Sequence, residues 1–389
     1  MTWPMVKLKN CCTIVGGATP RRDEKSFWDS PDIPWVTPKD ISNLKNKVIH
    51  DAPEYISQLG FDKSATFMLP EGSVLLTSRA PIGNLAVTGK PMCTNQGFKS
   101  LVPNPDVDCT YLYYCMLANI EKLQALGNGA TFKEVSKKVV EDFEIPLPPL
   151  DEQKRIAAIL DKADAIRQKR QQAIALADDF LRSVFLDMFG DPVTNSKGWP
   201  TKQLKTLSRV VTGNTPSRKE PENYGHGIEW IKSDNINTPH HYLTEAEERL
   251  SKYGLEKGRS VPSGSVLITC IAGSPHCIGN AAIADRQVSF NQQINALVPE
   301  GKTTTEYLYS IALFGKKLIQ DISTNAMKGM VSKGNLEKLQ VPAPPKELQE
   351  RYSHLFNEIS NARQHKLLSL EQSINLFDSL SQKAFNGEL

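Results

Sequence analysis

Residues 145–156 read IPLPPLDEQKRI, and residues 341–352 read VPAPPKELQERY. In both stretches a double proline precedes an acidic, glutamine-containing segment, which is typical of the start of a helix. Asp151 can cap the first of these helices, and Glu152 lies in the first turn, where a negative charge favours the helix dipole. A helix start that occurs twice in one chain predicts a repeated architecture.

The two helix starts are offset by 196 residues, and the same offset aligns further motifs along the chain. The aligned pairs are WPMVKL (3–8) with WPTKQL (199–204), IGN at 82–84 and 278–280, NQGF (95–98) with NQQI (291–294), and LVP at 101–103 and 297–299. The 389 residues are therefore two copies of one unit of about 193 residues.

Each copy begins with a mixed α+β domain. The runs GSVLLT (72–77) and GSVLIT (264–269) are glycine-led and rich in aliphatic residues, which predicts buried strands. Residues 110–124 and 305–320 have the composition of packed helices. Glycine- and proline-rich turns separate these segments, as in VGGATP (15–20).

Each copy ends with a helix of about 39 residues that carries one apolar stripe. In the first copy the stripe follows Ile156, Ile159, Ala163, Ile166, Arg170, Ala173, Ala177, Phe180 and Val184. In the second copy it follows Tyr352, Leu355 or Phe356, Ile359 and Ala362, and then shifts to Leu367, Leu370, Ile374 and Phe377. The shift is typical of a stutter, and Arg170 either sets the register or anchors a partner subunit.

A long helix with one apolar stripe must cover that stripe, and its own repeat is the nearest partner. The expected fold is α+β: two tandem-repeated mixed α/β heads joined by two long helices that form an antiparallel, pseudo-twofold symmetric coiled coil. The expected boundaries are 1–147 and 192–343 for the heads, and 148–191 and 344–389 for the helices. Two heads related by a twofold axis suit two half-sites on a DNA duplex.

The composition is that of an ordinary globular protein, with 40% hydrophobic and 23% charged residues. The formal net charge is +3, and residues 191–346 are net basic by five, a modest indication of a polyanionic partner. No run is long and apolar enough for a membrane span. Seven cysteines without framework spacing favour reduced thiols and a cytoplasmic location.

The order of these segments resembles the specificity subunit of Type I restriction-modification systems. The resemblance covers the whole chain. It rests on the doubled helix start in IPLPPLDEQKRIAAILDKADAIRQKR (145–170) and VPAPPKELQERY (341–352), and on the helix ends FGD (189–191) and FNGEL (385–389). It implies that the heads are target-recognition domains, each reading one half of a bipartite, asymmetric site in double-stranded DNA.

The resemblance also implies a set of partners. The two helices would set the gap between the half-sites and dock two methyltransferase subunits, which methylate adenine at N6. Restriction subunits would add cleavage of unmodified DNA. S-adenosylmethionine, ATP and Mg are expected in these partners, and no cofactor is expected to be bound by this chain.

The sequence itself predicts no catalysis by this chain. It contains neither a G-x-x-x-x-G-K-[ST] phosphate loop nor the N/D-P-P-F/Y tetrapeptide of adenine methyltransferases. A cysteine and histidine group around Cys270 lacks a second ligand pair, so no metal site is predicted. The alternative hypothesis is a protein-interaction scaffold with two heads, which the nearly neutral first head would suit.

The two heads differ most in three places, which are expected to read different bases. We call them the variable segments: residues 36–41, 78–81 and 129–134 in the first head, and residues 231–236, 270–277 and 325–330 in the second. Arg79 is the foremost candidate, because its guanidinium can bind guanine O6 and N7, or else a phosphate.

The remaining DNA-contact candidates are polar residues in or beside these segments. Asn95-Gln96 and Asn291-Gln292 can pair with adenine, although capping of a common turn is the competing interpretation, because a shared motif does not explain different readings. Lys39 and Lys232 are expected to bind phosphates. Lys133 and Lys328 are expected either to bind phosphates or to form a solvated helix face. The other candidates are Thr77, Ser78, Asn235 and His276.

Overall fold

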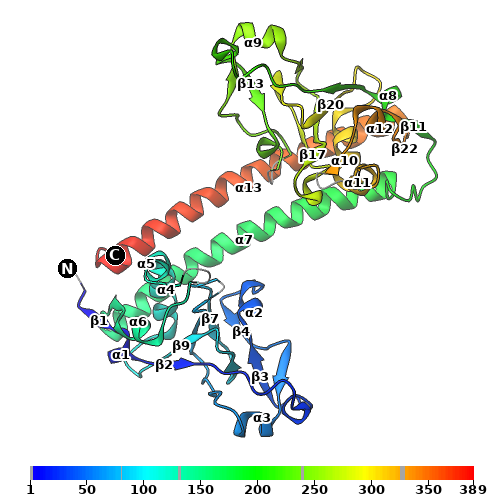
Figure 1. Cartoon of the computed structure of the whole chain (residues 1–389). Helices are drawn as coiled ribbons and strands as arrows, with labels where there is room; N and C mark the ends of the chain where they lie inside the picture. Colours follow the sequence, from blue (N-terminus) through cyan, green and yellow to red (C-terminus); the bar gives the residue numbers. More distant parts are fainter. Residues whose placement is uncertain (1–2, 80, 130–132, 238–240, 325–328) are drawn as a thin grey trace. The chain divides into compact units, whose positions relative to one another are not determined.

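The computed structural model describes residues 3–79, 81–129, 133–237, 241–324 and 329–389. Its contacts divide into two compact units. The first consists of Met1–Arg170 with Ser369–Leu389, and the second of Gln171–Leu368 (Figure 1). Each unit therefore contains one head together with parts of both long helices.

The head of the first unit is mixed α/β, as the sequence predicts. Its elements are β1 (Met5–Lys7), α1 (Leu8–Cys11), β2 (Cys12–Gly16), η1 (Lys25–Phe27), β3 (Ile33–Val36), α2 (Pro38–Ser42), β4 (Val48–Ile49), β5 (Glu54–Ile56), α3 (Gln58–Asp62), β6 (Val74–Leu76), β7 (Leu85–Thr88), β8 (Cys93–Thr94), β9 (Lys99–Pro103), α4 (Cys109–Ala118), α5 (Ile120–Ala125), α6 (Lys137–Asp142) and β10 (Glu144–Pro146). One sheet has the order β2-β9-β6-β7-β4 and another the order β5-β3-β8. Strands β1 and β10 form a separate antiparallel pair.

The head of the second unit repeats this plan. Its elements are β11 (Thr201–Gln203), α8 (Leu204–Leu207), β12 (Arg209–Thr212), η2 (Pro221–Asn223), β13 (Tyr224–Ile231), η3 (Ser233–Asn235), β14 (Arg249–Leu250), α9 (Lys252–Lys257), β15 (Ser260–Val261), β16 (Val266–Thr269), β17 (Ile271–Ala272), η4 (Pro275–Cys277), β18 (Ala281–Ile283), β19 (Val288–Phe290), β20 (Ile294–Val298), α10 (Thr305–Phe314), α11 (Lys316–Asp321), β21 (Gly329–Met330), α12 (Lys333–Lys338) and β22 (Gln340–Pro342). The sheets have the orders β12-β20-β16-β18 and β14-β13-β19-β15, and two short pairs are β11-β22 and β17-β21.

The two long helices are α7 (Leu150–Phe189) and α13 (Lys346–Asn386), each beginning directly after the predicted proline-rich segment. Both are rich in charged residues, and no helix in the described ranges combines the length and apolar character needed to cross a bilayer. The shorter helices expected at 110–124 and 305–320 are each broken in two, at Asn119 and at Gly315.

A glutamine near the start of each long helix fastens that helix to its head. The side chain of Gln153 is buried. Its Oε1 accepts from the Asp108 amide (2.9 Å), and its Nε2 donates to the carbonyls of Asp106 (3.1 Å) and Pro148 (2.8 Å). Gln349 is buried in the same way. Its Oε1 accepts from the Thr303 hydroxyl (2.5 Å) and its Nε2 donates to Pro344 (2.9 Å). We call each of these fastenings a joint.

A tyrosine completes each joint. The Tyr111 hydroxyl donates to the Pro146 carbonyl (2.7 Å), and the Tyr307 hydroxyl donates to the Pro342 carbonyl (2.8 Å). The last turn of the other long helix packs on the same tyrosine. In the first unit, the ring centroid of Phe385 of α13 lies 5.7 Å from that of Tyr111. In the second unit, the ring centroid of Phe189 of α7 lies 4.8 Å from that of Tyr307. Each joint therefore holds the start of one long helix and the end of the other.

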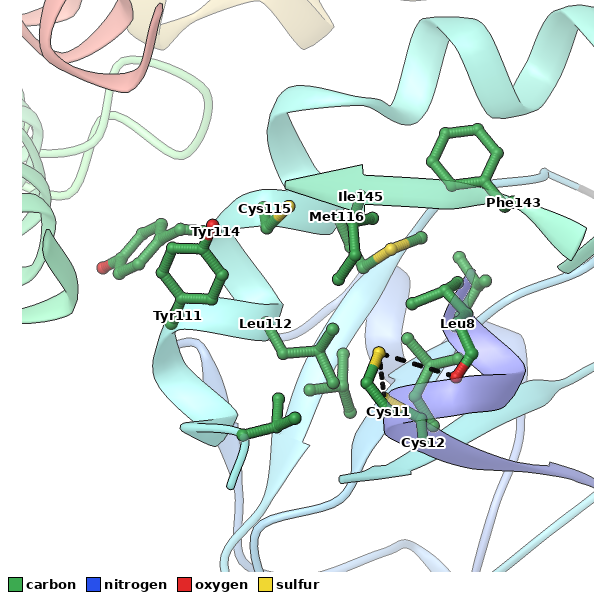
Figure 2. Packing of buried hydrophobic residues seen from close by; sticks show 14 of the residues in the cluster. Leu8, Cys11, Cys12, Tyr111, Leu112, Tyr114, Cys115, Met116, Phe143 and Ile145 are labelled. Atoms are coloured by element: carbon green, nitrogen blue, oxygen red, sulfur yellow. Dashed lines mark hydrogen bonds between the residues drawn. The ribbon is translucent and has the colours of Figure 1, made fainter. Parts of the chain in front are cut away.

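The hydrophobic core of the first unit gathers around its joint. Figure 2 shows the side chains of α4, among them Tyr111 and Leu112, opposite Leu8, Cys11 and Cys12. The same core includes Ile156 and Leu160 of α7 and Phe377 and Ala384 of α13. The equivalent core of the second unit contains Phe185, Phe189, Tyr307, Tyr352 and Phe356.

The single apolar stripe predicted for α7 is wrong in part, because Ile166 is 46% exposed and Phe180 is 58% exposed. Leu160, Ile174 and Leu181 are buried instead. The reason is that each half of α7 packs against both a head and α13, so that its buried surface is wider than one coiled-coil stripe. Ile374, placed in the stripe of α13, is likewise exposed.

Polar contacts occupy the middle of both long helices. Arg170, which interrupts the predicted stripe, donates to the Ser369 carbonyl of α13 (2.5 Å). In the second unit the buried Arg363 forms a two-pronged ion pair with Asp178 (2.6 and 3.1 Å). Such paired charges favour one register of two helices over others.

Substitution of the buried glutamine tests the joint. Gln153→Leu leaves a buried N–H and two buried carbonyls without their partner, so we expect the opening free energy of α4 to fall by about 2–4 kcal/mol. Hydrogen exchange of the α4 amides in the full chain measures this. Gln349→Leu should lower the opening free energy of α10 in place of that of α4. Gln172→Leu, at an exposed position of α7, is the matched control and should change neither. Equal effects of both joint variants on α4 and α10 would contradict a local role.

Candidate nucleic-acid interface

A turn at the same place in each head forms the centre of the candidate interface. We call it the NQ turn, residues 95–97 and 291–293. Asn95 Oδ1 accepts from the Gly97 amide (2.8 Å), and Asn291 Oδ1 accepts from the Gln293 amide (3.0 Å). Both asparagines therefore cap a turn by a local side-chain to backbone bond.

Two of the variable segments bond directly to each NQ turn. In the first head, the Asn95 amide donates to Val36 O (3.1 Å), and the Ser78 amide donates to Gly97 O (2.8 Å). In the second head, the Asn291 amide donates to Ile231 O (3.1 Å). The Cys270 amide there donates to Gln293 O (2.8 Å). The same backbone frame thus carries different sequences in the two heads.

The third variable segment joins the same place through the second. In the first head, Arg79 and Glu134 form a β-bridge, and the Val135 amide donates to Ser78 O (3.0 Å). In the second head, β17 pairs with β21 and the Val331 amide donates to Cys270 O (2.8 Å). Segments that are far apart in the chain therefore meet around one turn in each head.

Several first-head candidates are exposed beside this turn. Gln96 is exposed on the turn, and Lys39 is exposed on the short helix α2. Lys133 is also exposed, and the next residue, Glu134, forms a β-bridge with Asn128. Arg79 is half-buried, and its guanidinium has no hydrogen-bond or ion-pair partner among the residues that the structure describes. A guanidinium held at a strand end is suited to a base edge or a phosphate.

Thr77 and Ser78 have internal roles. Both are fully buried. The Thr77 hydroxyl donates to Pro81 O (2.7 Å), and the Ser78 hydroxyl donates to Gly97 O (3.1 Å). Direct DNA contact by these two side chains would require the segment to open, so they support the neighbouring Arg79.

The second-head candidates divide in the same way. Gln292 is exposed, and His276 is exposed on η4. Asn235 is buried and its Oδ1 accepts from the Lys232 amide (3.0 Å), so it caps a turn. Lys328 lies outside the described residues.

Lys232 is not a free cation in this fold. Its Nζ lies 2.7 Å from Glu248 Oε1, and this hydrogen bond raises the pKa of the lysine. Glu248 also pairs with Arg218 (2.6 Å), which lies over the rings of Tyr224 and Trp230. A phosphate contact by Lys232 would therefore compete with an existing ion pair.

Two lysines near the variable segments were not predicted. Lys99 lies 3.4 Å from Ser78 Oγ and 3.4 Å from Glu134, between two variable segments. Lys316 of α11 donates to His276 O (2.6 Å) and also bonds to Asn280. Neither lysine lies in a segment that differs between the heads, so comparison of the two copies alone did not find them.

The loop 270–277 is longer than its first-head counterpart and is held by packing. Cys270 is buried, and burial raises the pKa of its thiol to about 11. Gln320 donates to Ile278 O (3.2 Å), as Gln124 donates to Ile82 O (2.8 Å) in the first head. Among the described side chains, no group of three His, Cys, Asp or Glu residues is placed to hold a metal ion.

Comparison with protein families shows what this arrangement is similar to. The family model of the Type I restriction modification DNA specificity domain matches the chain twice, over residues 1–176 and 196–372. The two matches reproduce the internal repeat found in the sequence.

Individual relatives carry related descriptions. The chain is 31% identical over 235 residues to the MjaIX specificity subunit of a Type I restriction enzyme from Methanocaldococcus jannaschii, covering 56% of this chain and 54% of that protein. It is 28% identical over 157 residues to the EcoR124I/EcoR124II specificity subunit from Escherichia coli, covering 39% of this chain and 38% of that protein. The matches thus span about half or less of the length of these relatives.

The fold is also similar to a solved structure. The Type I restriction-modification S subunit from M. genitalium aligns with a TM-score of 0.62 at 14% identity, covering 99% of this chain and 96% of that one. At this identity the likeness concerns the fold alone.

Proposed function

The chain belongs to the family of Type I restriction modification DNA specificity domains, and from this premise we propose that it is the DNA-specificity subunit of a Type I restriction-modification enzyme. Each head binds one half of a bipartite, asymmetric site in double-stranded DNA. The chain supplies recognition and no chemistry. S-adenosylmethionine, ATP and Mg belong to the methyltransferase and restriction subunits with which it acts inside the cell.

One observation carries this proposal: three variable segments surround one turn in each head, and the Asn-Gln pair of that turn is the same in both heads. A protein that recognises two different half-sites needs a backbone frame that both heads share and surrounding segments that differ between them. The reason is that base readout depends on which side chains reach the base edges. A scaffold for two protein partners would not need this division around a single turn.

In this proposal the exposed residues of the variable segments make the contacts with DNA. Arg79 reads a base in the first half-site, and Lys39 and Lys133 bind its phosphates. In the second head, His276 and its long loop take the place of Arg79. Thr77, Ser78 and Asn235 shape these segments from within.

The long helices set the distance between the half-sites in this proposal, as an antiparallel, pseudo-twofold coiled coil. Support comes from the joints, because each one holds the start of one long helix and the end of the other. A head fastened to both helices transmits any change in helix length to the position of its half-site.

The helices also dock the methyltransferase subunits, two in number, in this proposal. Within the second unit, a hollow of about 920 Å³ lies between α7 and α13. Phe180, Val184, Leu348 and Leu355 line it, and Phe180 and Leu355 are exposed. Leu376, which corresponds to Phe180 by the repeat, is exposed in the first unit. Exposed apolar positions of this kind mark surfaces for protein partners.

The proposal predicts a two-part binding site. We expect the chain, purified with its methyltransferase, to select from random duplexes two blocks of fixed bases separated by a constant gap of unselected bases. Sequencing of the bound fraction measures this. Selection of one uninterrupted block, or of no sequence at all, would contradict the assignment of one half-site to each head. Binding of other proteins without DNA would favour the two-headed scaffold.

Arg79→Ala tests base readout. Loss of a bidentate contact to guanine should weaken binding by about 1–3 kcal/mol and relax one position of one half-site only. The same duplex selection measures both effects. Lys133→Ala, which removes an exposed cation of the same head, should weaken all sequences alike. If Arg79→Ala also acts equally on every sequence, Arg79 contacts a phosphate.

Paired insertions test the helices as a spacer. One extra heptad between Arg170 and Gln171 and another between Leu368 and Ser369 preserve the packing period and lengthen each helix by about 10 Å. The gap between the half-sites should grow by roughly three base pairs, because base pairs rise about 3.4 Å. The control is the same insertion after Asn195, in the link between α7 and β11, which should leave the gap unchanged. An unchanged gap in the paired variant would exclude the spacer role.

A further inference from the structure

Both heads retain the same exposed polar pair at the centre of their most different surfaces. In the first head, the Thr19 hydroxyl donates to Gln96 Oε1 (2.5 Å). In the second head, the Thr215 hydroxyl donates to Gln292 Oε1. Each pair joins the NQ turn to the segment that follows β2 in the first head and β12 in the second. Both glutamines are exposed, so the pairs are not explained by core packing.

The threonine of each pair is held from both sides through the residue before it. The Ala18 amide donates to Thr94 O (3.0 Å), and the Ala18 carbonyl accepts from the buried Trp35 indole (3.0 Å). In the second head, the Asn214 amide donates to Phe290 O (3.1 Å), and its carbonyl accepts from the Trp230 indole (3.2 Å). A proline follows each threonine and restricts the backbone further.

The glutamine is held by the turn that carries it. The asparagine before it caps the turn in both heads. Gly17 and Gly213 let the backbone pass close by, since a Cβ at either position would lie 2.1 Å from the carbonyl oxygen of Asn95 or Asn291. Both members of the pair are thus placed before any ligand arrives.

The hydrogen bond also orients each glutamine amide and occupies one of the two lone pairs of its oxygen. Its Oε1 already accepts from the threonine, and its Nε2 donates to no other residue that the structure describes. A bidentate contact to adenine uses both the oxygen and the nitrogen of the amide. A phosphate oxygen only accepts, and a single outward N–H donor is sufficient for it.

We propose that Gln96 and Gln292 are equivalent, sequence-independent anchors, each donating through Nε2 to a phosphate of the DNA backbone. The inference rests on the proposed function as a DNA-specificity subunit and assigns these two residues a role other than base readout. Thr19 and Thr215 are positioning residues that orient the two amides. The anchors place the same point of each head on the duplex, and the variable segments read bases around that point.

Binding of the full chain, with its methyltransferase, to its selected duplex, to all single-base variants of that duplex and to a random duplex tests the anchors. Gln96→Leu should weaken every one of these duplexes by the same factor of about ten, the effect of one hydrogen bond to a charged group. Gln292→Leu should do the same. Thr19→Val should weaken binding less, and should add nothing once Gln96 is leucine. The control is Gln58→Leu, because Gln58 is exposed on α3 of the same head and, among the described residues, its side chain donates to Asp62 of the same short helix.

The outcomes separate the anchors from the proposed function. A changed base preference at one half-site in Gln96→Leu would make this residue a base reader and overturn the inference, as would unchanged affinity. A wild-type complex that binds all duplexes equally would reject sequence specificity. Uniform weakening by both glutamine variants would still support the anchors in that case. Absence of any DNA binding by the wild-type complex would overturn both.

Discussion

The buried glutamine at the start of each long helix is the interaction on which the rest of the structure depends. Gln153 and Gln349 each connect a double proline, a long helix and the loop that begins the main helix of a head. A primary amide is well suited to this position, because it can accept and donate at once where three polar groups would otherwise lose their partner. These are three backbone groups at Gln153, and a hydroxyl and two backbone groups at Gln349. The joint therefore fastens the start of one long helix to each head, and an aromatic contact adds the end of the other long helix.

The repeat, the mixed α/β heads and the two long helices could be predicted from the sequence, because each depends on local patterns: proline pairs, apolar runs and an offset of 196 residues. The buried face of α7 could not be predicted in full. Ile166 and Phe180 follow the heptad period but are exposed, since the head competes with α13 for the surface of the helix. Arg363 was not foreseen in the stripe of α13, because its burial depends on a carboxylate, Asp178, 185 residues away.

The candidate interface was predicted at the level of segments rather than side chains. Comparing the two copies located the variable segments, and the asparagine of each NQ motif caps a turn, which was the competing interpretation of that motif. The Thr19–Gln96 hydrogen bond could not be predicted from local sequence patterns, because its two residues lie 77 positions apart. A preorganised neutral donor also fits the modest charge of the chain. Phosphates can be bound by placed N–H groups as well as by lysine and arginine, so a net charge of +3 is compatible with a DNA partner.

In the function proposed here, one chain carries two DNA readers, one in each head, which the long helices hold at a set distance. Sequencing of N6-methyladenine in a host that expresses this chain with its methyltransferase tests it most directly. We predict methylation within one bipartite, asymmetric motif, with two specified blocks and a gap of constant length. Replacement of either head by that of another family member should change one block and preserve the other. Methylation in a single uninterrupted motif, or a head exchange that alters both blocks together, would contradict the account.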